Sequence, residues 1–163
     1  MAIITLNNNS LSSVTSLPAG VGGKVLQVVS AILGTQISSS STTYVDTGLS
    51  ASITPSSASS KILILINHNG VRKESADNSN AINMRLYRDA TNLGNFALYS
   101  LYTGTTLGLF GSTLSMNYLD SPSTTSSTTY KTQFANFVNA SAAVLQDSGA
   151  KSGITLMEIA GWL

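Results

Sequence analysis

The stretches LSASIT (residues 49–54) and KILILI (residues 61–66) decide the fold of this 163-residue chain. In the first stretch, apolar and hydroxyl side chains alternate with a period of two, which is typical of a strand with one buried face. The second stretch is apolar on both faces, which places it in the middle of a sheet in a β-sandwich rather than on an edge. Residues 55–60 between them have the Pro- and Ser-rich composition of a turn.

The strand pattern continues on both sides of this centre, with short spacing and no alternating helices. Further strand candidates are residues 24–32, 42–47, 81–88, 96–101, 107–119, 128–137 and 154–163. Residues 140–145 fit either a short helix or a strand, and the charged, polar segment 67–80 is expected to be a long exposed loop. Eight to ten such strands indicate an all-β fold, namely an antiparallel β-sandwich that is jelly-roll-like and spans residues 24–163.

Residues 1–23 differ from the rest, because they have no helical apolar period and end in a cluster of Pro and Gly. Such a cluster marks a boundary, here near Gly22–Gly23. The segment is either a frayed terminus or an extended N-terminal arm that becomes ordered on a partner. The apolar residues that the arm offers for partner binding are Ile3, Ile4, Leu6, Leu11, Val14 and Leu17.

The composition limits the classes of partner. Only 9% of the residues are charged, against roughly 25% in ordinary soluble domains, and 27 Ser and 18 Thr supply polarity instead. A net charge of +1 provides no field for nucleic acid or an anionic membrane. The absence of Cys excludes disulfides and thiolate metal sites. No apolar run is long enough for a membrane span, and no secretory signal pattern is visible at the N-terminus.

Catalytic groups are sparse. His68 is the single His, and no carboxylate stands near it at metal-ligand spacing. A Ser nucleophile would need His68 as its base, but the chain has no G-x-S-x-G elbow. We therefore expect His68 to be an ordinary residue of a loop or a strand end.

The sequence also offers a few candidate oxygen ligands for a cation and a few carboxylates. Asp77–Asn80 with Glu74 offer oxygens to a hard cation, but lack the spaced carboxylates of a Ca²⁺ loop. A glycosidase needs two carboxylates, and Glu74 and Glu158 are the only glutamates that could be tested as such a pair. The sequence predicts no enzyme and no cofactor.

An aromatic cluster has two interpretations. Phe96, Tyr99, Tyr102 and Phe110 fit core packing, or a subunit interface or carbohydrate-binding face, because Tyr offers rigid amphipathic area. The C-terminal strand is so apolar that it must lie centrally in a sheet or be covered by a neighbouring subunit. The residues proposed for a subunit interface are Tyr99, Tyr102, Phe110 and Trp162.

Several separated segments carry a family resemblance. They are GKVLQVV (23–29), SSSS (38–41) followed by TTYVD (42–46), LSASITPSSASSKIL (49–63) and ITLMEIAG (154–161), with MAIITLNNNS (1–10) as a leader. In this order they resemble small β-sandwich structural modules of tailed bacteriophages, especially aquatic ones, which occur as ends of tail fibres and as stand-alone virion proteins. The resemblance covers most of residues 23–163, although 67–120 contribute little to it.

The resemblance implies a virion component, assembled in the host cytoplasm, and a homotrimer with a jelly-roll-like subunit. It implies no catalytic motif. One hypothesis is a capsid decoration (cement) or head-appendage protein, anchored to the major capsid protein by the arm. The alternative is a tail-fibre tip or small tail appendage that binds a host-surface receptor such as a glycan. A glycan depolymerase is the third, disfavoured reading.

Overall fold

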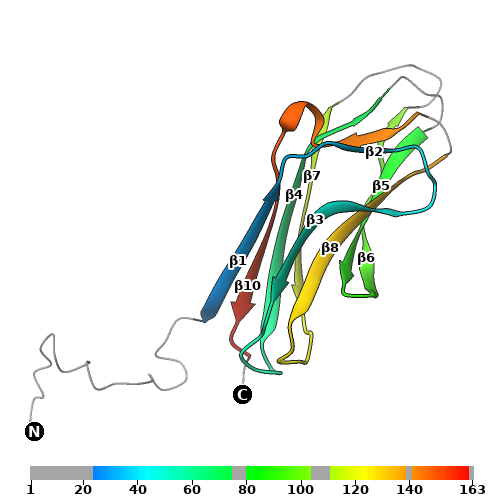
Figure 1. Cartoon of the computed structure of the whole chain (residues 1–163). Coiled ribbons are helices and arrows are strands. Elements are labelled where there is room, and N and C mark those ends of the chain that lie inside the picture. Colours follow the sequence, from blue (N-terminus) through cyan, green and yellow to red (C-terminus); the bar gives the residue numbers. More distant parts are fainter. Residues whose placement is uncertain (1–23, 75–79, 104–110, 139–140, 162–163) are drawn as a thin grey trace, which may run out of the picture.

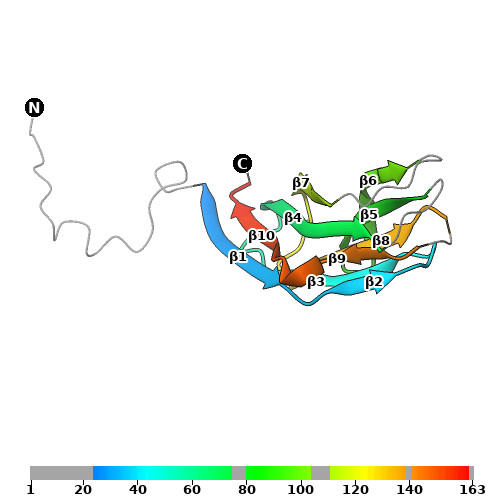
Figure 2. The ribbon, with the colours of Figure 1, turned by 90° about the horizontal axis from the view of Figure 1, so that it is seen from above.

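Two antiparallel sheets pack face to face in the computed structural model, which describes residues 24–74, 80–103, 111–138 and 141–161 (Figure 1). The β4 sheet consists of β1 (Val25–Leu33), β2 (Ile37–Ser39), β4 (Lys61–Lys73), β7 (Ser112–Asp120), β9 (Ala143–Leu145) and β10 (Ser152–Ile159). The β8 sheet consists of β3 (Val45–Ile53), β5 (Asn80–Arg88), β6 (Thr91–Thr103) and β8 (Thr128–Asn136). Figure 2 shows the two layers from above.

The strand order is that of a jelly roll. β1 and β2 pair with β10 and β9, and β10 and β9 both pair with β4, so each short strand extends its longer neighbour. The β4 sheet is then ordered β1/β2, β10/β9, β4, β7, while the β8 sheet is ordered β3, β8, β5, β6. Chain-distant strands therefore lie side by side in both sheets, in the nested order of two Greek keys. The predicted all-β, jelly-roll-like sandwich is confirmed.

The alternating pattern of residues 49–54 determines which side chains face the core. In β3, Leu49, Ala51 and Ile53 are buried, and in β4 the buried set includes Ile62 and Ile64. Two neighbouring clusters of such side chains fill the space between the sheets, one around Tyr130 and Leu156 and the other around Phe134 and Met84. β4 lies between β10 and β7, and β10 lies between β1 and β4, so both apolar strands are central, as expected.

The prediction of a long exposed loop over residues 67–80 is wrong for its first half. β4 continues to Lys73, with His68, Val71 and Lys73 buried. A register shift between His68 and Val71 contains Gly70, whose φ of 60° is the left-handed conformation that glycine adopts without strain. The polar side chains of this segment can be buried because they meet polar partners from distant parts of the chain.

The ambiguous segment 140–145 ends in a strand. β9 is fully buried, and a short 3₁₀ turn at Asp147–Gly149 (η1) separates it from β10. The bulge at Gly70 makes room for this turn, since a Cβ built on Gly70 would lie 2.7 Å from the Asp147 nitrogen. Within the described residues no helix is long or apolar enough to cross a membrane.

Candidate functional site

An unbroken line of apolar side chains crosses the outer face of the β4 sheet. The strand registers place one residue of each of the four strands opposite the next, and all four point away from the core. We call these residues the apolar row: Val28, Met157, Leu63 and Leu119. The two end members are each 54% exposed, and the two central members are half-buried by their neighbours.

More apolar surface adjoins the apolar row on the same face. Leu26 and Leu65 are also exposed, and Ile32 is 74% exposed at the far end of β1. Around the apolar row the outward-facing charged residue is Lys61, whose Nζ donates to Ser121 Oγ at 2.7 Å, and Arg72 lies further along β4, where it pairs with Asp147 at 2.9 Å. A contiguous apolar surface with almost no charge is typical of a face that contacts another protein.

The outer face of the β8 sheet is built in the opposite way. There the registers align one polar side chain from each strand into what we call the polar row: Asp46, Gln133, Arg85 and Asn95. Gln133 donates to Asp46 Oδ1 at 2.6 Å and accepts from Arg85 at 2.8 Å. The Arg85 guanidinium also lies 3.9 Å from the centre of the Tyr44 ring. These groups satisfy one another and leave a surface suited to water.

Two of the four residues predicted for a subunit interface lie on the surface together. Tyr99 and Tyr102 of β6 are 56% and 52% exposed, and the Tyr99 ring packs edge-on against Phe137 with centroids 4.7 Å apart. Tyr99 and Leu101 have positive φ angles of 53° and 56°, which cost energy for residues with a Cβ. We call the exposed residues Leu98, Tyr99, Tyr102 and Phe137 the tyrosine patch.

The other members of the predicted sets lie elsewhere. Phe96 of the aromatic cluster packs partly buried against both core clusters. Phe110 and Trp162 lie outside the described residues, as do all six predicted arm residues: Ile3, Ile4, Leu6, Leu11, Val14 and Leu17. The interface and arm assignments therefore remain predictions.

His68 lies in the core, where it joins the two sheets through neutral hydrogen bonds. Its Nε2 is 2.9 Å from Thr132 Oγ1 of β8, which shares a hydrogen bond of 2.6 Å with Thr47 Oγ1 of β3. On its other side, the Gln146 amide nitrogen donates to His68 Nδ1 at 3.4 Å and to Ser152 Oγ at 2.7 Å. These five residues form the His68 cluster.

The surroundings of His68 determine its charge. His68 is 0% exposed, and burial lowers its pKa to about 4, so it is neutral at physiological pH. Among the described residues no three His, Cys, Asp or Glu side chains converge as a metal site. His68 is thus a structural core residue.

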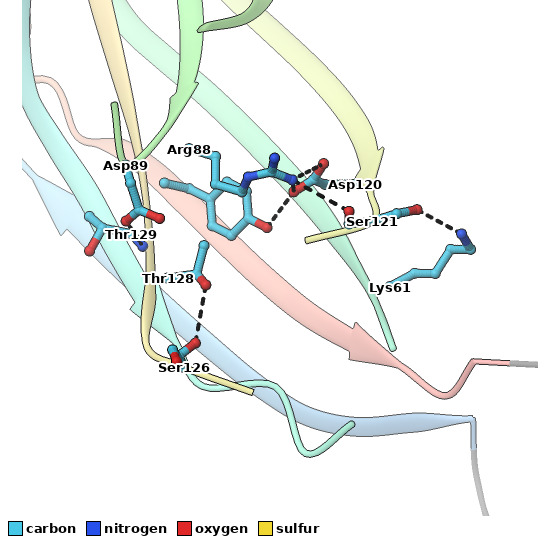
Figure 3. A network of polar contacts seen from close by, with 9 residues as sticks. Lys61, Arg88, Asp89, Asp120, Ser121, Ser126, Thr128 and Thr129 are labelled. Atoms are coloured by element: carbon cyan, nitrogen blue, oxygen red, sulfur yellow. Dashed lines mark hydrogen bonds and ion pairs between the residues drawn. The ribbon is translucent and has the colours of Figure 1, made fainter. Parts of the chain in front are cut away.

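A second polar cluster bridges the sheets at the other end of β4. Asp120 of β7 accepts from Arg88 Nη1 of β5 through both carboxylate oxygens, at 3.0 and 2.8 Å, and accepts from the Tyr130 hydroxyl of β8 at 2.7 Å. Figure 3 shows Arg88 directed at Asp120, with Lys61 reaching the adjacent Ser121. Burial and the hydrogen bond to Asp120 raise the pKa of Tyr130 above its ordinary range, which keeps the donor protonated. These three residues form the Asp120 cluster.

The two glutamates weighed as a catalytic pair are far apart. Glu158 is buried and pairs with Ile62 near the start of β4, whereas Glu74 is exposed just beyond its other end. Twelve residues along the chain separate Ile62, which lies opposite Glu158, from Glu74, and in an extended strand this is about 40 Å. Burial raises the pKa of Glu158, but hydrogen bonds from Ser56 and Gln27 outweigh burial and bring the pKa to about 2. Glu158 is therefore a fixed carboxylate that holds the 54–60 turn.

The predicted cation ligands are not brought together either. Asn80 is buried, and its side-chain oxygen accepts from the Ala81 backbone nitrogen at 2.8 Å. Residues 75–79, including Asp77, lie outside the described residues. A shallow depression of about 610 Å³ lies instead beside β2 and is lined almost wholly by hydroxyl residues, Ser38–Thr42, with Ala142.

Comparisons with known proteins give structural likeness only. No protein-family model matches the sequence, and no curated protein matches it. Among solved structures, the chain is similar to the VP2 subviral particle of infectious bursal disease virus, with 14% identity and a TM-score of 0.48 over 84% of this chain and 38% of that chain. The Gx strain of the same virus gives 15% identity and a TM-score of 0.48 over 84% and 33%.

This chain thus spans only 33–38% of the length of these two viral chains. Identity at this level carries no function across, because one fold serves many functions. Function has to be argued from the surfaces of this molecule itself.

The sequence contains a signal for the apolar row, because KILILI is apolar on both faces and predicts a central strand. The structure gives β4 neighbours on both sides, but within the described residues no layer covers its second face, where Leu63 and Leu65 point outward. An apolar second face on a two-layer sandwich predicts an interaction surface.

Proposed function

We propose that the chain is a non-enzymatic structural protein of a tailed-phage virion, namely a capsid decoration (cement) or head-appendage protein held in the particle by its N-terminal arm. The apolar row carries this proposal, because a jelly roll with a contiguous apolar strip across one outer face is suited to contact other proteins. The resemblance of the separated sequence segments to tailed-phage β-sandwich modules supports the virion location. The same resemblance supports a homotrimer.

The polar interior supports a structural rather than a catalytic role. The His68 cluster is closed off from solvent, and Glu158 and Glu74 lie at opposite ends of the β4 sheet. The described surface offers apolar and hydroxyl groups, which favour packing and hydrogen bonding with a protein partner.

Location in the intact particle tests the proposal. A cryo-EM map of virions should show the jelly roll at regular positions on the head lattice, and gold-labelled antibody should decorate heads. Particles without this protein in their structure would overturn the virion role.

Removal of the arm tests the attachment. Particles grown with a chain lacking residues 1–22 should lose this protein, while the full chain is retained. Full occupancy without the arm would contradict the attachment role. A matched control is a chain in which Asn7, Asn8 and Asn9 are replaced by Ser, because it keeps the arm's length and apolar residues.

The tyrosine patch favours a second candidate, a tail-fibre tip or small tail appendage that binds a host-surface glycan. Exposed Tyr rings stack on sugar faces, and Tyr99 is exposed in a backbone conformation that is unfavourable for a residue with a Cβ. Purified protein should then block phage adsorption, and Tyr99→Ala with Tyr102→Ala should abolish the block. Head labelling together with unchanged adsorption would exclude this candidate.

A further inference from the structure

The apolar row has no cover within the described part of the chain, although it crosses a whole sheet. Two of its members are more than half exposed, and the polar row on the opposite face shows how the same fold makes a surface for water. An apolar strip about 14 Å wide, the span of four strands, needs an extended or flat partner.

The length and composition of the arm match that strip. Residues 1–23 contain no charged side chain, and the sheet surface around the apolar row contains Lys61, while Arg72 lies beyond the Gly70 bulge and is paired with Asp147. The arm's tip, MAIITL, is its most apolar part, and the NNNSLSS that follows offers amides and hydroxyls. These groups can hydrogen-bond to the polar side chains that lie two residues along from the apolar row on the same face, namely Ser30, Thr155 and Asn117.

The point where the arm joins the sheet favours another copy as the receiver of the tip. The arm enters β1, the edge strand that contributes Val28, so an arm folded over its own sheet starts beside the apolar row. Such an arm would run about 13 Å along β1 to reach the apolar row and then about 14 Å across the sheet. About eight extended residues cover this path. The tip, Ile3–Leu6, would then lie about 30 Å beyond the sheet.

We propose that the tip of the arm, residues 3–6, docks on the apolar row of a neighbouring copy of this chain. The contact is heterologous, because an arm on one copy meets a sheet face on the next, and such contacts form a ring when the rotation between copies closes. In this proposal the arm's partner is a second copy of the chain, so that the arms link copies to one another. The proposal rests on the proposed function only for the arm's role in assembly.

Sedimentation of purified protein tests the contact without any particle, so its outcome is separate from that of the virion proposal. The full chain should sediment as a closed oligomer. The arm variant I3S/I4S/L6S and the row variant V28K/L119K should each sediment as monomers. Ile32→Thr is the matched control: it removes a more exposed apolar group on the same strand and face, outside the apolar row, and should leave the oligomer intact.

Mixing the two monomeric variants distinguishes exchange between copies from an arm folded on its own sheet. In the mixture, an intact arm from the row variant can dock on the intact row of the arm variant, so mixed dimers should appear. Circular dichroism of each variant confirms that it is folded. A monomeric full chain, an unchanged oligomer in either variant, or failure of the mixture to form mixed dimers would each overturn the proposal.

Discussion

The two polar clusters that join the sheets differ in charge, and the difference teaches how this sandwich is held. The Asp120 cluster, at the start of β4, contains an ion pair with two-oxygen geometry and a buried phenol donor. The His68 cluster, further along β4, does the same bridging with neutral groups alone. The charged cluster should respond strongly to the loss of one partner, and the neutral cluster should respond to protonation.

The largest effect is expected when the charged cluster loses its acceptor. Asp120→Ala leaves the Arg88 guanidinium and the Tyr130 hydroxyl without their shared partner, and should lower the free energy of unfolding by about 3 kcal/mol. Urea denaturation followed by tryptophan fluorescence measures this loss. A loss below about 1 kcal/mol would show that the cluster is not a bridge.

The neutral cluster should respond to acid. The pKa of His68 is lowered from 6.5 to about 4 in the folded state, so the unfolded chain takes up a proton first as the pH falls. Stability from this group is fully present above pH 6.5 and is lost progressively down to about pH 4, by up to about 3 kcal/mol. Urea midpoints across this pH range give the slope. His68→Gln keeps a hydrogen-bonding side chain and should flatten it; an equally steep slope in that variant would assign the titration elsewhere.

Variants that remove a single hydrogen bond should show a smaller difference in stability between the two clusters. Tyr130→Phe keeps the ring and removes the donor to Asp120, which should cost about 1–2 kcal/mol because the acceptor is charged and buried. Thr132→Val in the neutral cluster should cost somewhat less, about 1 kcal/mol, although it touches both His68 and Thr47. Thermal unfolding compares the two variants directly. A larger cost for Thr132→Val would reverse the order of the clusters.

The smallest effect is expected on the outer face. Lys131 and Asp46 form an ion pair of 2.9 Å whose members are partly exposed, and the hydrogen bond from Lys131 lowers the pKa of Asp46. Lys131→Met should change the free energy of unfolding by less than about 1 kcal/mol, because solvent screens such pairs. The same denaturation series serves as the baseline for the Asp120 cluster. A change as large as that of Asp120→Ala would mean that exposure does not distinguish the two ion pairs.

Alternation within single strands predicted much of the fold. LSASIT correctly placed Leu49, Ala51 and Ile53 inside, and the apolar character of KILILI and of the last strand correctly made both central. Local patterns of this kind depend on the chain's own periodicity, which one sequence contains. The prediction of a loop after Ile66 is wrong, because the burial of this polar segment depends on Thr132 and Gln146, which are distant in the chain.

The candidate site depends on information that a single sequence lacks. The apolar row exists because β1, β10 and β7 pair with β4 in particular registers, which bring Val28, Met157 and Leu119 level with Leu63. Register between strands far apart in the chain is set by tertiary packing. Tyr99 and Tyr102 were identified by residue type and are exposed, while their role in an interface stays a prediction.

The near absence of charge on the face that bears the apolar row also sets how assembly responds to the medium. Contacts between uncharged surfaces gain nothing from long-range attraction and lose nothing to ionic screening. Association through this face should therefore be as strong in concentrated sodium chloride as in dilute buffer, and sulfate should tighten it by favouring apolar burial. An oligomer joined through this face should therefore hold together equally well in fresh and in saline water.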